Sequence, residues 1–329
     1  RIAFISVHTS PLAPMGGKKT GGMNVYIREL SQELGKQGYQ VDIFTRRSSD
    51  HEPEIDYAIG DNVRVVYLSA GPVASLSPDE HYPYLSDFTT NLIAFTMLHN
   101  IQYDVIYSHY WLSGWVAAKL KEAWGIEFVH MFHTLGHMKR RIKDAQHYSP
   151  DMRIMTEAHI IGWADKIIAA TPAEHAQLLW LYHADRRKIE IIPPGVNMDN
   201  FHNVLPSEQA KHELGIEPDT RMLLFVGRIE PLKAVDTILE SLYVMREQAP
   251  HLLHNLLFTI VGGDPKNAQD DEMQRLQDLS VELGIDPIVN FVGAKEQSQL
   301  PMYYSAATAV IMPSDYESFG MVALEAMAT

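Results

Sequence analysis

One continuous stretch, MLLFVGRIEPLKAVDTILE at residues 222–240, contains a strand, a tight turn and the start of a helix. The apolar run before Gly227 predicts a buried strand, and Leu232–Gln248 has the pattern of a helix. Gly227 allows a tight turn between them, while Arg228 and Lys233 place two cations beside the N-terminus of the helix. The planar fork of arginine and the point charge of lysine suit a diphosphate, although two solvated surface cations would give the same pattern.

The same order of strand and helix runs through the rest of the chain, which predicts an α/β protein with parallel sheets. It breaks at Pro193–Gly195, so we expect two Rossmann-like, doubly wound domains, 1–200 and 201–329, that face a cleft. The second half supplies four strands against seven in the first, and Gly320–Thr329 has the pattern of only the first turns of a helix. We therefore expect the second domain to be incomplete. The predicted strands are Ile2–Val7, Gln40–Phe44, Val63–Leu68, Val105–Ser108, Phe128–Phe132, Lys166–Ala170, Ile189–Ile192, Met222–Val226, Leu256–Val261, Ile288–Val292 and Ala307–Ile311.

The composition excludes several kinds of site. The 329 residues include no cysteine, so disulfides, cysteine zinc sites, iron–sulfur clusters and cysteine nucleophiles are ruled out. A formal net charge of -14 argues against binding to nucleic acid or to an anionic membrane, because both depend on clustered lysine and arginine. No apolar run approaches the roughly 20 residues of a membrane span, and no signal-peptide pattern opens the chain, so we expect a cytoplasmic protein.

A glycine-rich loop, Gly16–Asn24, and a histidine, His133, also follow predicted strands. The glycines let backbone N–H groups approach a ligand, but a flexible loop without a ligand fits equally well. His133 lies at the carboxyl end of a strand, where open α/β sheets bind ligands, and we interpret it as a hydrogen-bonding group in a sugar site. A purely structural role for His133 is an alternative that stays open. A metal cluster with His130 and His137 is disfavoured, because no nearby acidic residue completes a ligand set.

Two carboxylates, Glu317 and Glu325, mark the start of the last predicted helix. They are separated by about two helical turns at about 1.5 Å rise per residue. At that separation they can contact different parts of one extended ligand, but they are poorly placed to act as a close acid and base on one bond. The spacing alone is common by chance.

Taken together and in this order, the motifs resemble family-4 retaining glycosyltransferases, which have the GT-B fold. The resemblance covers nearly the whole chain and is closest to the branch of mycothiol glycosyltransferase (D-inositol 3-phosphate glycosyltransferase) and sucrose-phosphate synthase. The stretches that carry it are PPGVN (Pro193–Asn197), GRIEPLKAVDTILE (Gly227–Glu240), ESFGMVALEA (Glu317–Ala326), VHTSPLAPMGGKKTGGMNVYI (Val7–Ile27), SHYWLSG (Ser108–Gly114) and HTLGHMK (His133–Lys139).

The resemblance implies transfer of a hexose from a nucleotide sugar, most often UDP-linked, to a sugar or polyol acceptor, with the donor configuration retained. It implies no metal or other cofactor, and the chain has no D-x-D sequence. The residues implied in catalysis are His133, Arg228, Lys233 and Glu317. Those implied in donor binding are Gly21, Gly22, Arg228, Lys233, Glu317, Phe319, Gly320 and Glu325. Those expected at the acceptor, including Lys139 as a remaining cation, are Asn24, Tyr110, Thr134, Lys139 and Arg153.

One departure concerns the acceptor. Both branches carry a lysine on the loop before the helix that is expected to begin near Pro83, where this chain has Pro78 followed by Asp79 and Glu80. Losing a cation there weakens the case for a phosphorylated acceptor, although Lys139 and Arg153 could still bind phosphate.

Two other functions stay open at this point. The first is a nucleotide-sugar 2-epimerase, which would need no acceptor, and the second is a binding module without catalysis. A homo-oligomer is possible.

Overall fold

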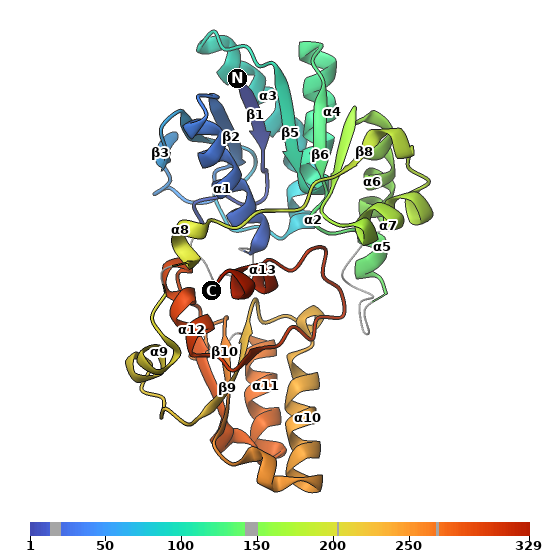
Figure 1. Ribbon diagram of the computed structural model, residues 1–329. Helices are drawn as coiled ribbons and strands as arrows, with labels where there is room; N and C mark the ends of the chain where they lie inside the picture. The colour runs from blue at the N-terminus through green and yellow to red at the C-terminus, as the bar shows by residue number, and fades with distance from the viewer. Residues whose placement is uncertain (14–20, 142–150, 203, 268–269) are drawn as a thin grey trace. The chain divides into compact units, whose positions relative to one another are not determined.

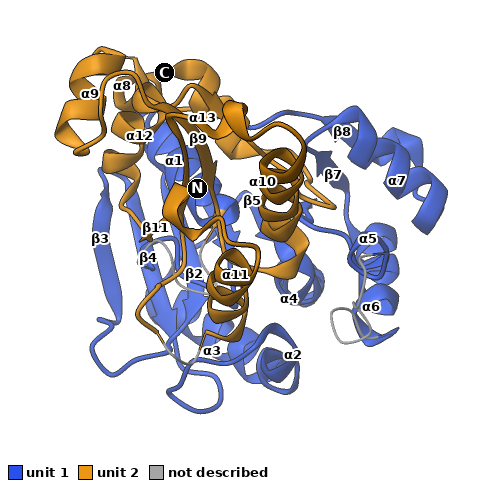
Figure 2. Cartoon of the chain, turned by 90° about the horizontal axis from the view of Figure 1, so that it is seen from below, with its two compact units in different colours: residues 1–13, 22–194 blue, residues 14–21, 195–329 orange. Residues whose placement is uncertain are grey.

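The computed structural model describes residues 1–13, 21–141, 151–202, 204–267 and 270–329 (Figure 1). The chain divides into two compact units (Figure 2). The first consists of residues 1–13 and 22–194, and the second of residues 14–21 and 195–329. Each unit is an α/β structure built on its own sheet.

The first unit is built on β1 (Ile2–Ile5), β2 (Val41–Arg46), β3 (Ile55–Gly60), β4 (Val63–Leu68), β5 (Val105–His109), β6 (Phe128–Met131), β7 (Lys166–Ala169) and β8 (Ile189–Ile191). They form one eight-stranded sheet in the order β3-β4-β2-β1-β5-β6-β7-β8. All neighbouring pairs are parallel except β3 with β4. The loops that follow β1, β5 and β6 therefore leave the same edge of the sheet, which is where such folds bind ligands.

Helices cover both faces of this sheet, because alternate residues of a strand point to opposite sides. Ala3 and Ile5 pack with Phe88 and Trp111 in one core, whereas Phe4 packs in a second core with Ile27. The described helices are α1 (Gly22–Lys36), α2 (Pro78–His81), η1 (Tyr82–Tyr84), α3 (Leu85–Leu98), α4 (Tyr110–Trp124), α5 (Gly136–Lys139), α6 (Asp151–Trp163), α7 (Pro172–Tyr182) and η3 (Arg186–Lys188).

The structure differs from the sequence-based prediction in three places of this unit. Strand β3 was not predicted; it is a partly exposed edge strand whose sequence, IDYAIG, lacks a regular apolar pattern. Helix α4 begins at Tyr110, where the backbone has a φ of 73°, whereas the sequence pattern predicts a helix only from Gly114 to Trp124. The residues expected to form a loop, Pro78–His81, are the short helix α2, which Ser77 and Glu80 cap reciprocally.

The second unit has a four-stranded parallel sheet in the order β11-β10-β9-β12. Its strands are β9 (Arg221–Val226), β10 (Leu256–Val261), β11 (Val289–Gly293) and β12 (Ala309–Val310). Phe225 and Phe258 point into one core, whereas Met222 and Leu224 point into another. The helices are α8 (Met198–Phe201), α9 (Ser207–Glu213), η4 (Pro231–Lys233), α10 (Val235–Gln248), η5 (Pro250–Leu253), α11 (Asp271–Glu282), η6 (Asp286–Ile288), η7 (Gln297–Gln299), α12 (Leu300–Ala306) and α13 (Met321–Ala328).

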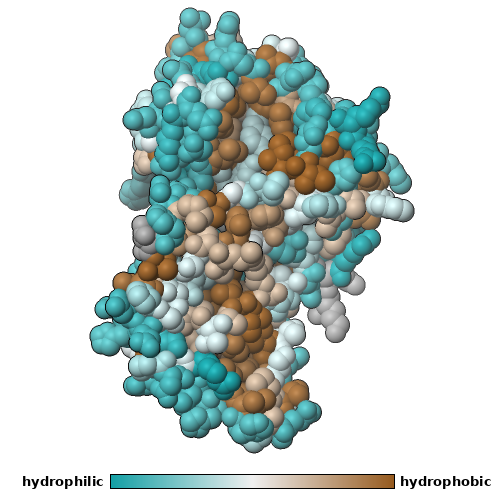
Figure 3. All heavy atoms as spheres, in the orientation of Figure 1, coloured by the Kyte–Doolittle hydropathy of each residue, from teal (hydrophilic) through white to brown (hydrophobic). Residues whose placement is uncertain are grey.

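The visible surface is mixed in character. On the face shown in Figure 3, hydrophilic side chains cover most of each unit and hydrophobic ones form smaller areas between them. Within the described ranges, no helix combines the length and the apolar character that crossing a bilayer requires.

Candidate functional site

Two cations follow β9 in the second unit, and each is paired with a carboxylate. Arg228 Nη1 lies 2.6 Å from Glu230 Oε1. Lys233 Nζ lies 2.5 Å from an oxygen of Glu317, which is 84 positions further along the chain. Ion pairs of this kind hold long, flexible side chains in one region before a ligand arrives, which lowers the entropy that binding must overcome.

The backbone explains why the cations lie at this turn. Gly227 donates its N–H to the carbonyl of Val261 at 3.0 Å, which keeps β9 and β10 together to their ends. A Cβ at Gly262, where φ is 149°, would lie 1.8 Å from the Gly227 oxygen, so only glycine fits there. Ala234 then takes a left-handed conformation, with a φ of 48°, and α10 begins. The chain bends at Gly227, and the hydrogen-bonded turns of this segment follow later, from Glu230 to Lys233 and from Pro231 to Ala234.

The loop before α13 is tied to the same region. Asp315 donates its N–H to the carbonyl of Leu232 at 3.1 Å, and this contact carries Glu317 to Lys233. Gly320 forms the N-terminal boundary of α13 with a φ of 90°, and the adjacent Phe319 is half-buried. The structure thus brings Lys233 and Glu317 together within the second unit.

Glu325, one turn into α13, lies in a buried polar group. Its Oε2 accepts a hydrogen bond from the Tyr304 hydroxyl at 2.7 Å, and its Oε1 one from Gln297 at 3.5 Å. Burial raises the pKa of Tyr304, and the negative charge of Glu325 raises it further. The tyrosine is therefore a lasting donor that fixes the Glu325 carboxylate in one orientation.

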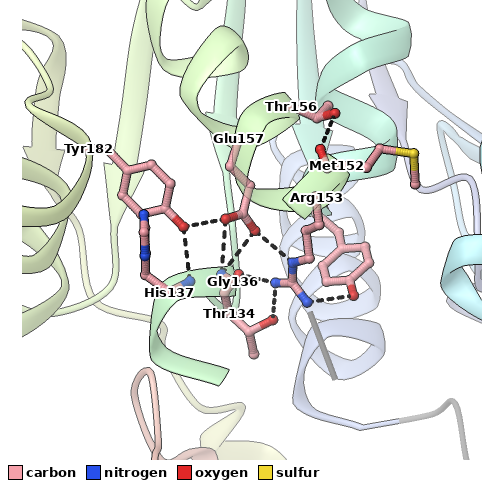
Figure 4. A network of polar contacts seen from close by, with 9 residues as sticks. Thr134, Gly136, His137, Met152, Arg153, Thr156, Glu157 and Tyr182 are labelled. Atoms are coloured by element: carbon pink, nitrogen blue, oxygen red, sulfur yellow. Dashed lines mark hydrogen bonds and ion pairs between the residues drawn. The ribbon is translucent and has the colours of Figure 1, made fainter. Parts of the chain in front are cut away.

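A second polar centre lies in the first unit, around a buried arginine (Figure 4). Arg153 of α6 is 2% exposed, and its Nε donates to Glu157 Oε1 at 2.8 Å. The same guanidinium donates to the Thr134 carbonyl at 2.8 Å, to the Thr134 hydroxyl at 3.1 Å and to the Tyr110 hydroxyl at 3.1 Å. It also stacks over the Tyr110 ring, 4.9 Å from the ring centre. Three of the residues predicted at the acceptor, Tyr110, Thr134 and Arg153, thus lie together.

Glu157 is the carboxylate that balances this centre. Besides Arg153, it accepts hydrogen bonds from the N–H of Gly136 at 2.9 Å and from the Tyr182 hydroxyl. Burial alone would lower the pKa of Arg153, but Tyr110 and Glu157 outweigh it and raise the pKa. Arg153 is therefore a permanent cation whose charge is balanced by Glu157.

Several histidines surround this centre. His8 stacks obliquely on Tyr110 with ring centres 4.4 Å apart, and it contacts His81 edge-on at 6.4 Å. Nδ1 of His109 and Nε2 of His133 are 3.1 Å apart. Burial lowers the pKa of His133 to about 3 and that of His8 well below its ordinary value. Burial lowers the pKa of His109 as well, so the imidazoles of His8, His109 and His133 are neutral at pH 7 and act as hydrogen-bonding groups without adding positive charge.

A carboxylate of α2 (Pro78–His81) also interacts electrostatically with the arginine. Burial raises the pKa of Asp79 in α2, and the positive charges of Arg153 and Lys139 lower it in part. Asp79 is therefore within electrostatic reach of both predicted acceptor cations. Lys139 itself ends α5 and is half-buried.

Comparison with known proteins identifies the family. The sequence profile of Glycosyltransferase Family 4 matches residues 20–200, and that of Glycosyl transferases group 1 matches residues 206–329. The chain belongs to glycosyltransferase family 4. It is 39% identical over 332 residues to D-inositol 3-phosphate glycosyltransferase of Corynebacterium urealyticum, covering 100% of this chain and 77% of that protein. It is also 39% identical over 331 residues to the enzyme of the same name from Thermobispora bispora, covering 76% of that protein.

Solved structures agree. The glycosyltransferase superimposes on sucrose-phosphate synthase from Thermosynechococcus elongatus with a TM-score of 0.89 and 33% identity, over 99% of this chain and 78% of that one. The predicted GT-B fold is therefore confirmed, as is the predicted branch of the family.

The remaining predicted site residues, Asn24, Gly21 and Gly22, lie at or just before the start of α1. Asn24 of α1 is buried and donates to the Thr9 hydroxyl and the Ser10 carbonyl, both at 2.7 Å. Gly21 groups with the second unit, whereas Gly22 begins α1 in the first. The part of the predicted glycine-rich loop at 16–20 lies outside the described residues. Among the described residues, no group of three or more potential ligands could hold a metal ion.

Sequence analysis missed four residues of the first unit: His8, His109, Glu157 and Tyr182. Glu157 had a usable signal, since it lies four positions after Arg153 in a stretch, Arg153–Ala164, that has the pattern of a helix, and residues at that spacing are neighbours on a helix. His109 lies within SHYWLSG, next to Tyr110. His8 likewise lies within VHTSPLAPMGGKKTGGMNVYI. Tyr182 had no such signal, because only the folded sheet brings its segment to this edge.

Proposed function

We propose that this glycosyltransferase moves a hexose from a UDP-linked nucleotide sugar to a hydroxyl of a sugar or polyol, with retention at the reacting carbon and without a metal. The observation that carries the proposal is the pair of positioned cations, Arg228 and Lys233, at the strand ends of the second unit. Their charge can stabilise the departing diphosphate, which a metal ion would otherwise do.

We assign the rest of the donor to the loop and helix that follow. The Glu317 carboxylate and the N–H groups at Phe319 and Gly320 would hold the hexose hydroxyls. Glu325, oriented by Tyr304, would accept from the ribose hydroxyls. Such bidentate acceptance selects a diol and positions it, because carboxylates accept strongly from paired hydroxyl donors.

We assign the acceptor to the first unit, around Tyr110, Thr134 and Arg153, with Asn24 and Lys139 as further contacts. The curated relatives are named for D-inositol 3-phosphate, and the structural relative is a sucrose-phosphate synthase. The charges of Arg153 and Lys139 are offset here by Glu157 and Asp79. We therefore expect a phosphate on the acceptor to contribute less to binding than two uncompensated cations would allow.

The reaction follows from these assignments. As the bond to the diphosphate breaks, negative charge grows on the leaving phosphate beside Arg228 and Lys233, and positive charge grows on the sugar ring. The acceptor hydroxyl attacks from the face of the leaving group, and the departing phosphate takes its proton. His133 would then contact the donor sugar near the reacting carbon and orient it.

The test uses purified protein. UDP, GDP and ADP, and their glucose and N-acetylglucosamine conjugates, are ranked by thermal shift and calorimetry, and the best donor is then offered pairs of acceptors with and without a phosphate. Transfer that depends on both substrates supports the proposal. Epimerisation of the donor in the absence of any acceptor would instead show a nucleotide-sugar 2-epimerase, and nucleotide binding without turnover would show a binding module.

A further inference from the structure

Two neighbouring strands of the first unit bring a pair of histidines together. His109 is the last residue of β5, where it lies opposite Met131 of β6, and His133 follows two residues after β6. The His133 backbone has a φ of 60°, a conformation that few non-glycine residues adopt. This turn brings Nε2 of His133 to 3.1 Å from Nδ1 of His109. The contact is a hydrogen bond whose direction depends on the tautomers of both rings.

The two rings differ in their surroundings. His109 is fully buried, whereas His133 is half-buried. Around His109 lie the rings of Tyr107 at 4.3 Å and Phe4 at 5.3 Å between ring centres, and that of Tyr26 at 5.9 Å. Its second nitrogen, Nε2, is buried and has no hydrogen-bond partner among the described residues. Burial lowers the pKa of both histidines, so one N–H lies between two neutral rings.

Two arrangements of that proton are possible. If His133 donates from Nε2, then His109 must carry its own proton on Nε2, and a buried N–H is left without an acceptor. If His109 donates from Nδ1, its bare Nε2 is left as an acceptor without a donor. Orphaned buried N–H groups are rarer in proteins than under-satisfied acceptors, so the second arrangement is favoured. In that arrangement Nε2 of His133 is the acceptor, and the proton of His133 sits on Nδ1.

The neighbouring His130 follows the same rule. Its Nδ1 lies 2.8 Å from the Ser108 hydroxyl, and the Ser108 hydroxyl lies 3.3 Å from the Val129 carbonyl. A hydroxyl that donates to Val129 accepts from Nδ1–H of His130, and this again leaves an unpaired Nε2. Both buried histidines at this edge of the sheet thus favour a proton on Nδ1.

We propose that His109 is a positioning residue that fixes His133 as the Nδ1–H tautomer, so that His133 presents a hydrogen-bond donor, and not a base, to whatever ligand it meets. In the proposed glycosyl transfer, on which this consequence rests, His133 steadies an oxygen of the donor sugar. It does not remove the acceptor proton, because its one unprotonated nitrogen is already occupied by His109.

The experiment is a long-range ¹H–¹⁵N correlation spectrum of the full chain labelled with ¹⁵N-histidine, recorded at pH 7.5. The signals of His133 and His109 are assigned from the His133→Gln and His109→Leu variants, and the exposed His159 is removed in His159→Leu as a control that should move neither signal. We expect both rings to be protonated on Nδ1. A wild-type spectrum with the His133 proton on Nε2 would overturn the proposal, whether or not transferase activity is found.

Two variants of His109 then distinguish a role in setting the His133 tautomer from a role only in stabilising the fold. His109→Asn keeps an N–H donor near the original Nδ1, whereas His109→Leu removes it. In His109→Leu we expect His133 to populate both neutral tautomers. We also expect kcat to fall by about 10- to 100-fold, as loss of an orienting partner typically causes. His109→Asn should restore the Nδ1–H tautomer and most of kcat. An unchanged His133 tautomer in His109→Leu would show that His109 does not set it.

Discussion

The buried pair of Arg153 and Glu157 gives the sharpest test of the energetics of the first unit. Glu157→Gln keeps the size of the side chain and one carbonyl oxygen, but removes the negative charge that balances Arg153. Both side chains are 2% exposed or less, so water cannot replace the lost partner. Breaking one side of a buried ion pair typically costs about 3–5 kcal/mol. With a urea m-value of about 2 kcal/mol/M, the unfolding midpoint should fall by about 1.5–2.5 M.

Tryptophan fluorescence isolates this effect. All five tryptophans lie in the first unit, so their emission reports unfolding of that unit without a contribution from the second. The matched control is Glu190→Gln, which breaks the exposed pair of Glu190 with Lys166 in the same unit and should leave the midpoint within error. Arg153→Met combined with Glu157→Gln should recover part of the loss, because it removes the unpaired charge. A loss below about 1 kcal/mol in Glu157→Gln would refute the reasoning.

Three further predictions concern the donor and pH. Arg228→Ala and Lys233→Ala should each lower kcat about 10²- to 10³-fold, since each removes a positioned charge at the leaving group; near-normal steady-state rates in both would contradict the diphosphate assignment. Glu325→Ala should weaken UDP binding, measured by calorimetry, more than acceptor binding, and unchanged UDP affinity would move the ribose site elsewhere. Burial raises the pKa of Glu174 to about 7 in the folded protein, above its unfolded value. Between these two pKa values the folded state holds one proton more than the unfolded state, so the free energy of unfolding falls as the pH rises from the lower value to the higher one. Glu174→Gln should abolish this loss, leaving the variant more stable than wild type at pH 7.5 by up to about 3 kcal/mol and similar at pH 4.5; equal urea midpoints at pH 7.5 would exclude it.

The turn and the two cations that we propose to bind the donor could be predicted because they are local in sequence. Gly227, Arg228 and Lys233 lie within seven residues of one strand, turn and helix, and each has the conformation or charge that the pattern requires. The link from Lys233 to Glu317 could not be predicted, since it depends on the Asp315 contact that ties two distant loops together.

The polar centre around Arg153, which we propose to bind the acceptor, was predicted only in part, because burial is not visible in the sequence. Arg153 and Glu157 have the spacing of an exposed helical ion pair, and only the packing of α6 against its neighbours removes them from water. Strand β3 was missed for a related reason: an edge strand such as IDYAIG needs little apolar surface, so its pattern resembles a loop.

We propose that positioned cations on the second unit let this protein transfer a hexose with retention and without a metal. The most direct measurement is ¹H NMR of the reaction of donor and acceptor in excess EDTA, read at the anomeric proton of the product. We expect a product with the anomeric configuration of the donor and a rate that EDTA does not change. An inverted product, or a rate that EDTA abolishes and added Mg²⁺ restores, would contradict it.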